Sequence, residues 1–340
     1  MRTLAGLRAD LERLDASLSA FNDVPDLPPG AALMRRGLAE IRDDVRADLS
    51  DARRARLEVV LQGVPVVGHE VRIDALAKLL HSLQESVSSI AQAIAGKATA
   101  RAAIPGPLRD ATALRLASVF PGSFGAVLRG PIDDAEGEQG LFELDEAVPT
   151  LLDTAVGTIL DVVALAAVDD PNDMSIVEAV LPLGARSFKH LNALSAAIVD
   201  DDLSARIAFV SPGALPRSVL LDRAAARALS DALGRNRLTE DQEVLIGHLG
   251  TVSDIRNRVE LQTESEIITA RVIDEVVPLL AQFYSRHVAA TFDVTTVRSL
   301  VTGEERKSYL LVGLSTEGAP EPLDQSVFGR PDREEPDLPF

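Results

Sequence analysis

The chain of 340 residues contains no cysteine and no tryptophan. The absence of cysteine excludes disulfide bonds, thiolate catalysis, iron–sulfur clusters and cysteine-based zinc sites. Aromatic residues make up only 4% of the chain, whereas hydrophobic residues make up 46%. We therefore expect a core of leucine, valine, isoleucine and alanine, in a chain long enough for two or three domains.

Lysine and arginine are missing from residues 131–185, a stretch that holds 13 of the acidic residues. Most of its acids form two clusters: Asp133, Asp134, Glu136, Glu138, Glu143, Asp145 and Glu146, followed by Asp169, Asp170 and Asp173. A run of one sign must be solvated, neutralised by a cation or faced by a basic partner. One interpretation is two solvated loops on either side of a buried helix. The other is a docking surface for a basic protein partner. In one version, the acidic surface mimics nucleic acid and blocks a basic site on a nuclease or a DNA-binding protein.

The sequence shows no segment suited to a membrane. Residues 1–15 lack the apolar core of a signal peptide. The longest apolar stretch, residues 147–168, carries Asp153 and Asp161 and has no basic flanks. We expect a cytoplasmic protein. We also expect no direct binding of nucleic acid, because the most basic segment, residues 61–130, has a net charge of only +3.

The N-terminal 60 residues have the pattern of two helices. Apolar side chains recur three and four residues apart at Leu4, Leu7, Leu11, Leu14, Leu18 and Phe21. Three prolines in residues 22–30 end that helix, and a second helix follows. The pattern predicts a helical hairpin over residues 1–60. The alternative is a coiled coil between copies, in which Leu4, Leu7, Leu11, Leu14 and Leu18 form a homo-oligomer.

The middle region, residues 61–240, mixes helical and strand patterns, and it includes the acidic segment 131–185. We expect a helix over residues 74–95, a hairpin of strands over residues 111–120 and 123–129, and helices near 146–167 and 176–197. Strands over residues 205–210 and 218–221 and a helix capped by Asp222 follow. The predicted fold class is α+β.

Residues 241–315 have the pattern of a small β-barrel. Three predicted strands precede a short helix near 274–283, and two more strands follow it. This element order is typical of an OB-like barrel, and an SH3-like barrel would give a similar pattern. Residues 316–340 are acidic and rich in proline, which predicts a tail without a core of its own, ending in Phe340 as a side chain for a partner to capture.

Few residue patterns indicate chemistry. None of the five histidines has another histidine three or four residues away, and Ser123 is expected in a hairpin turn because PGSFG lacks the first glycine of a nucleophile elbow. The acids after Val168 fail the calcium-loop pattern, and Ser175 with Glu178 predicts a capping box.

One pattern resembles a known family. Asp293, Glu305 and Lys307 resemble the D…E-x-K arrangement of a large nuclease superfamily, in which two carboxylates hold a divalent metal and the lysine steadies water. The resemblance covers three residues.

The sequence assigns no catalytic residue, cofactor or metal ligand. We therefore predict a non-enzymatic accessory or regulatory protein, an inhibitor or an assembly subunit, that binds a basic protein partner. Its candidate contacts are the two acidic clusters and Phe340. The alternatives are a metal-dependent hydrolase or nuclease with Asp and Glu ligands, and a scaffold that assembles through the N-terminal helices.

Overall fold

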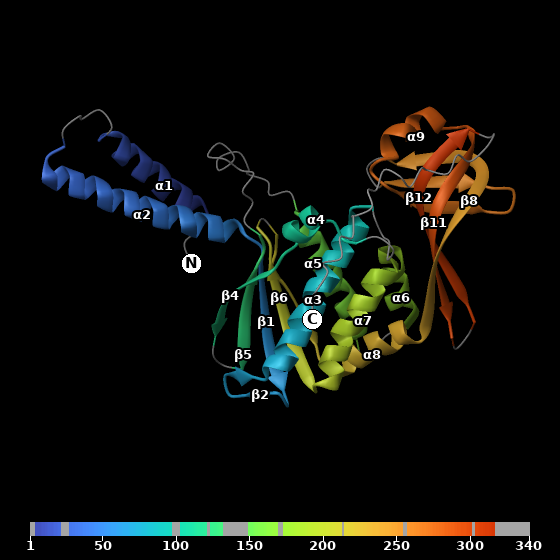
Figure 1. Cartoon of the computed structure of the whole chain (residues 1–340), viewed down its shortest axis with the longest axis horizontal. Helices are drawn as coiled ribbons and strands as arrows, with labels where there is room; N and C mark the ends of the chain where they lie inside the picture. Colours follow the sequence, from blue (N-terminus) through green and yellow to red (C-terminus); the bar gives the residue numbers. More distant parts are fainter. Residues whose placement is uncertain are drawn as a thin grey trace, which may run out of the picture. The chain divides into compact units, whose positions relative to one another are not determined.

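The computed structural model describes residues 4–21, 27–96, 103–120, 123–131, 149–168, 173–212, 214–253, 257–300 and 303–316. These residues form the mixed α+β structure that the sequence predicts. The chain divides into two compact units (Figure 1). The first unit holds residues 1–241 and 294–308, and the second holds residues 242–293 and 309–340.

The first unit begins with a hairpin of helices α1 (Leu4–Ser19) and α2 (Pro29–Arg53). Leu7 and Leu11 of α1 are buried against Val45 and Leu49 of α2. Proline is suited to the first turn of α2, because the amide nitrogens there have no partner within the helix. The three-four spacing of leucine thus produces an intramolecular helix pair.

A five-stranded antiparallel sheet follows, with the strand order β4-β5-β1-β6-β7. The strands are β1 (Arg56–Gly63), β4 (Arg115–Phe120), β5 (Phe124–Arg129), β6 (Leu203–Val210) and β7 (Arg217–Leu221). Burial alternates along β1, so that Leu57, Val59 and Leu61 enter the core. A short hairpin of β2 (Val66–Val67) and β3 (Glu70–Val71) leads from β1 to the first covering helix.

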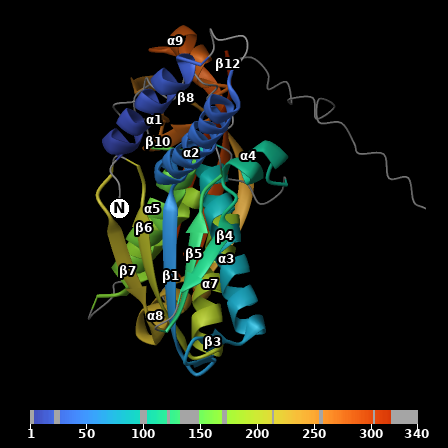
Figure 2. The ribbon, with the colours of Figure 1, turned by 90° about the vertical axis from the view of Figure 1, so that its left-hand side faces the viewer.

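Helices cover one face of this sheet (Figure 2). They are α3 (Ile73–Ile94), α4 (Gly106–Ala111), α5 (Leu151–Ala166), α6 (Asp173–Val180), the 3-10 turn η1 (Leu181–Leu183), α7 (Gly184–Asp200) and α8 (Arg223–Gly234). Their apolar sides share one core with the inward residues of the strands. None of the described helices is both long enough and apolar enough to cross a membrane.

Several predicted elements need correction. The helix expected over 176–197 is two helices separated by η1, where Pro182 cannot donate a backbone hydrogen bond and Gly184 has a φ of 77°. The helix expected from residue 146 begins at Leu151, because Thr150 and Asp153 form its capping box. The strand expected from residue 111 begins at Arg115, because α4 occupies the preceding residues.

The remaining strands form a second, closed sheet with the order β10-β12-β11-β8-β9. They are β8 (Asn236–Ser253), β9 (Arg258–Gln262), β10 (Ile267–Val272), β11 (His287–Ser299) and β12 (Glu305–Thr316), with α9 (Val277–Phe283) between β10 and β11. β10 runs antiparallel to β9 and parallel to β12. Inside the sheet, the rings of Phe292 and Tyr309 meet edge to face, with centroids 5.8 Å apart.

Candidate functional site

The face of the five-stranded sheet opposite the helices is a candidate binding surface in the first unit. Figure 2 looks onto this face, and no described helix lies across its strands. Because side chains alternate along a strand, the residues that alternate with the core residues point toward this face. We call this surface the open face; its members are Arg56, Glu58, Val60, Gln62, Arg115, Ser118, Phe120, Gly125, Val127, Arg129, Ser204, Arg206, Ala208, Val210, Ser218 and Leu220.

Three arginines form a row across the open face. Arg115 of β4 lies opposite Arg129 of β5, and Arg129 lies opposite Arg56 of β1. On the far side of β1, Arg56 pairs in register with Val210 of β6. Neighbouring strands lie about 4.8 Å apart, so the row brings three positive charges together within about 10 Å. Like charges directly opposite one another on a sheet are destabilising, which makes this row costly unless acids compensate it.

The acids near the row compensate only part of it. Arg129 donates to the backbone oxygen of Asp51 at 2.6 Å, and its second nitrogen lies 3.3 Å from the Asp51 carboxylate. Arg56 forms an ion pair with Glu58. Arg115 and Arg206 are exposed, and neither has an acid within ion-pair distance among the described residues. The open face therefore carries four arginines and a single glutamate in a chain whose net charge is −18.

Apolar side chains lie at the β6 end of the arginine row and farther along the open face. Val60 of β1 lies between Gly125 of β5 and Arg206 of β6. Val210 and Leu220 are 42% and 43% exposed, so each leaves a large apolar surface in water. A surface that combines exposed apolar residues with arginines is typical of a site for a polypeptide.

Phe120 lies across Gly125 on the same face. A Cβ atom at Gly125 would come within 2.3 Å of the Phe120 ring, so only glycine allows the ring this position. The ring shields the backbone of β5, and its own exposure is intermediate. The pair adds an aromatic surface to the apolar part of the open face.

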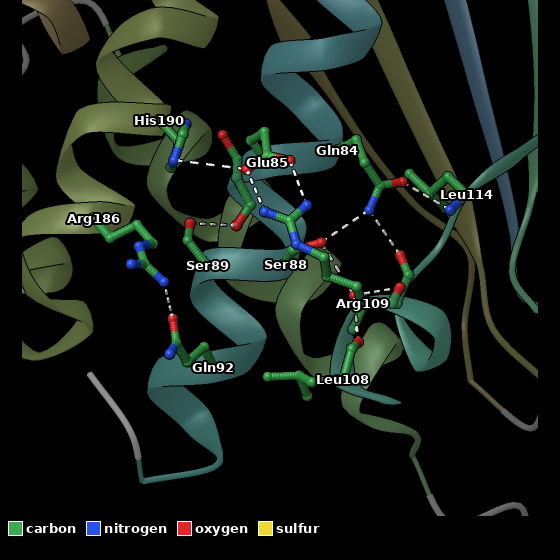
Figure 3. A network of polar contacts seen from close by, with 12 residues as sticks. Gln84, Glu85, Ser88, Ser89, Gln92, Leu108, Arg109, Leu114, Arg186 and His190 are labelled. Carbon is green, nitrogen blue, oxygen red and sulfur yellow. Dashed lines mark hydrogen bonds and ion pairs between the residues drawn. The ribbon is translucent and has the colours of Figure 1, made fainter. Parts of the chain in front are cut away.

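A buried polar network anchors β4, the edge strand that carries Arg115 and Phe120 (Figure 3). The Gln84 side chain on α3 accepts a hydrogen bond from the Leu114 backbone N–H at 2.8 Å and donates to the Thr112 backbone oxygen at 3.0 Å. Ser88 lies 3.1 Å from the Thr112 hydroxyl. One polar side of α3 therefore fixes the entry into β4 and holds Arg115 in register with Arg129.

The same network contains an acid, a base and a cation at close range. Arg109 of α4 binds Glu85 of α3 through two nitrogens, at 2.7 and 3.2 Å. This contact lowers the pKa of Glu85, although burial acts in the opposite direction. His190 of α7 lies 3.9 Å from Glu85, and burial lowers the pKa of His190 even though the Glu85 charge opposes the shift. Because Arg109 binds Glu85, we infer that Glu85, Arg109 and His190 hold α4 and α7 against α3.

Arg186 and Gln92 extend this contact between helices. Arg186 of α7 donates to the Gln92 side chain on α3 at 2.7 Å, although Gln92 is only 2% exposed (Figure 3). A buried amide that is satisfied in this way stabilises the packing of two helices. The described network therefore supports the sheet from its covered side.

Most of the predicted binding residues lie outside the described part of the chain. They are Asp133, Asp134, Glu136, Glu138, Glu143, Asp145, Glu146, Asp169, Asp170 and Phe340. Asp173 is the first residue of α6. Among the leucines considered for self-association, Leu7 and Leu11 are 3% and 2% exposed inside the hairpin, and Leu14 packs against the same small core.

The predicted capping box of Ser175 and Glu178 is not formed in the structure. α6 begins at Asp173, so Ser175 and Glu178 lie within the helix and the predicted capping box is wrong. Glu178 instead lies 3.4 Å from Arg306.

The structure shows one contact each for two residues of the nuclease-like pattern. Asp293 accepts a hydrogen bond from Gln242, and Glu305 lies 3.8 Å from Arg298. Within the described ranges, no group of three or more His, Asp or Glu side chains is placed to hold a metal ion.

Comparison with known proteins finds no matching family model, and no curated protein or solved structure matches the chain. The open face therefore has to be interpreted from its own chemistry. Sequence reasoning missed it, although the alternation in RLEVVLQG from Arg56 to Gly63 was a usable signal. That alternation places arginine, glutamate and glutamine opposite the three buried residues of β1.

Proposed function

We propose that this protein is a non-enzymatic accessory or regulatory protein that binds a protein partner, and that the open face is a binding surface for it. One observation carries the proposal: the face combines exposed apolar side chains with two arginines that form no ion pair with a described residue, and no described helix covers its strands. Arginine is enriched at protein interfaces because it pairs through several donors and also packs on apolar groups.

The acidic clusters supply a second proposed element, which binds a basic partner. The first cluster contributes seven acids over residues 133–146, the second contributes three over residues 169–173, and neither contains a lysine or an arginine. A strongly charged segment accelerates association with a partner of opposite charge, and salt weakens that attraction. The protein would thus bind through two elements of opposite charge, the open face with its arginines and the acidic clusters.

We further propose that the closed sheet is of the OB type. Three features support this: the strand order of the sheet, the parallel pairing of its third and fifth strands, and the helix between its third and fourth strands. In OB-type sheets the second and third strands form the ligand face. Here those strands, β9 and β10, carry no aromatic residue for base stacking, which favours a protein contact or a structural role.

The test compares partner capture by matched variants of the full chain at low salt. Wild type, the double variant Arg115→Ser/Arg206→Ser and the control Arg227→Ser are immobilised at equal density. Arg227 is an exposed arginine of α8, outside the open face. We expect the double variant to lose a bound protein that the wild type and the control retain, and 0.5 M salt to release it.

Two results would oppose the proposed function. Equal capture by all three proteins would show that the open face does not bind the partner. Turnover of a phosphoester by the purified protein, together with a stoichiometric divalent ion that survives dialysis, would instead favour the hydrolase.

A further inference from the structure

β4 forms one edge of the five-stranded sheet and is exposed on both of its faces. Its residues from Arg115 to Val119 are exposed, and Phe120 is of intermediate exposure. The strand pairs with β5 on one side, and no described strand pairs with it on the other. An edge strand directs alternate backbone N–H and C=O groups away from the sheet, where another extended chain can bind them.

The helix layer stops short of β4. Leu116 lies opposite Leu128, and Val119 lies opposite Ala126. Leu128 and Ala126 are buried on the helix-covered face, yet Leu116 and Val119, which share that face, are 53% and 58% exposed. The covered face therefore has an apolar step at β4, on which the side chains of one more strand would pack.

The strand at the opposite edge, β7, lacks such a step. Its Leu221 is buried, and Arg217 on the helix-covered face forms an ion pair with Asp161 of α5. The helices thus reach β7 but leave β4 uncovered. This difference selects β4 as the edge suited to a further strand.

The open-face side of β4 carries a positive charge that an added strand would meet. Within the arginine row, Asp51 binds Arg129, and Glu58 binds Arg56. Arg115, at the end of the row, forms no ion pair with a described residue. A strand added beside β4 would lie about 4.8 Å away, so its residue opposite Arg115 is well placed to pair with it. An acid at that position complements the row.

Two features define the shape of this edge. A bulge between Leu116 and Ser118 leaves Ala117 as the extra residue of β4, and a bulge limits pairing with long, flat strands. The contacts of Gln84 and Ser88 with residues 112–114 fix the start of β4 on α3. An edge that is already ordered reduces the entropy lost on binding. The edge therefore favours a short added segment.

We propose that β4 binds a short acidic segment of the protein partner as an additional strand of the sheet. The segment alternates acids, which face Arg115 on the open face, with apolar side chains, which pack on Leu116 and Val119. The inference rests on the proposed function, because it takes the open face to bind a partner, and it adds the chemistry and conformation of the bound segment. Backbone hydrogen bonds supply affinity in this mode, and the alternating side chains supply specificity.

Peptide binding to the purified full chain tests this proposal. The probe is a fluorescently labelled EVEVEV peptide at low salt, and the EEEVVV peptide has the same composition without the alternation. We expect EVEVEV to bind at least about tenfold more tightly, as measured by fluorescence anisotropy. Its binding should also slow amide hydrogen exchange in β4 and leave β7 unchanged. Absence of EVEVEV binding up to about 1 mM would overturn the proposal.

Protein variants test the role of the charge. Arg115→Glu should weaken EVEVEV binding at least about fivefold, whereas Arg115→Lys should stay within about twofold of the wild type. Arg227→Glu on α8 is the control and should bind as the wild type does. Salt at about 0.5 M should weaken wild-type binding. An unchanged affinity in Arg115→Glu would overturn the proposal.

Backbone methylation of the probe tests the added strand itself. One EVEVEV peptide carries N-methyl groups on its valines, and another carries them on its glutamates. Successive N–H groups of an extended chain point to opposite edges, so each peptide has one edge blocked. We expect one of the two to lose binding at least about tenfold and the other to retain it. Equal affinities of the two methylated peptides, high or low, would overturn the proposal.

Sedimentation of the protein alone tests whether a second copy covers the edge. We expect a monomer whose β4 amides exchange faster before the peptide is added. A dimer with slow exchange in β4 would overturn the proposal, because a second copy would then occupy the edge.

Peptide binding and partner capture fail independently. Equal affinities of the methylated peptides, with capture still dependent on Arg115 and Arg206, would exclude the added strand and leave the proposed function intact. Equal capture by all variants, with peptide binding that depends on the methylated edge, would remove the proposed function and leave β4 as an edge that binds an acidic strand.

Discussion

Arg115 and Arg129 lie directly opposite each other on β4 and β5, so two guanidinium groups occupy adjacent positions on one face of the sheet. Asp51 binds Arg129, whereas Arg115 has no acid within reach among the described residues. Stability alone does not explain this placement, because opposed like charges weaken a sheet. The proposed contact of the open face with an anionic group of a partner would explain it.

The first prediction removes one charge of this pair. Arg115→Thr should leave the free energy of unfolding unchanged or raise it by about 0.2–1 kcal/mol, because the repulsion is relieved and threonine suits a strand. Urea unfolding at low salt measures the gain, which should shrink in 0.5 M salt. Arg227→Thr serves as the control outside the open face. A loss greater than about 1 kcal/mol at both salt concentrations would show that Arg115 stabilises the fold.

The second prediction concerns the anchor of β4. Gln84→Ala leaves the Leu114 N–H without its acceptor and should cost about 1–3 kcal/mol. Hydrogen exchange should increase first in β4, while β6 and β7 keep their protection. Gln84→Glu keeps an oxygen for Leu114 but loses the donor to Thr112, so its effect should be smaller. Uniform loss of protection across the sheet would contradict a local anchoring role.

The third prediction uses the lowered pKa of His190. The unfolded chain protonates this histidine near pH 6.5, whereas the folded protein does so only at lower pH. The unfolded state therefore binds more protons below about pH 6.5, and stability falls as the pH decreases from that value. His190→Gln should flatten this fall between about pH 6.5 and pH 5. His287→Gln, on β11 of the other sheet, is the control.

Glu85 adds a second acid-sensitive contribution. Its lowered pKa means that stability from the Arg109 contact is complete above about pH 4.5 and is lost as the pH falls through the lowered value. The loss below pH 4.5 should therefore persist in His190→Gln and diminish in Glu85→Gln. If the dependence of stability on pH is unchanged in both variants, Glu85 and His190 do not cause the loss of stability in acid.

The fourth prediction tests the helical hairpin. Leu11 is 2% exposed between α1 and α2, so Leu11→Ala should destabilise the hairpin by about 2–5 kcal/mol. Limited proteolysis should then cut α1 and α2 earlier, while the sheet of the first unit stays protected. Leu33→Ala removes a side chain that is 72% exposed and should change neither result. Equal sensitivity of both variants would mean that a further contact covers Leu33.

Local patterns predicted many of the elements. The leucine spacing of the first 21 residues predicted the first helix, and the strands expected over residues 258–263 and 267–273 lie close to the observed β9 and β10. These patterns are informative because a helix and a strand repeat with different periods. The breaks in the pattern were harder to predict: Pro182 and Gly184 interrupt a helix that otherwise has continuous apolar spacing.

The binding surface shows where sequence reasoning ends. The sequence determined that Arg56, Glu58 and Val60 share one side of β1, since side chains alternate along a strand. It also determined the acidity of residues 131–185 and the absence of cysteine chemistry. Only the tertiary structure decided that helices cover the opposite side, and that β4 and β5 bring Arg115 and Arg129 into register with Arg56. Strand register and helix cover depend on contacts between residues far apart in the chain, which local periodicity does not encode.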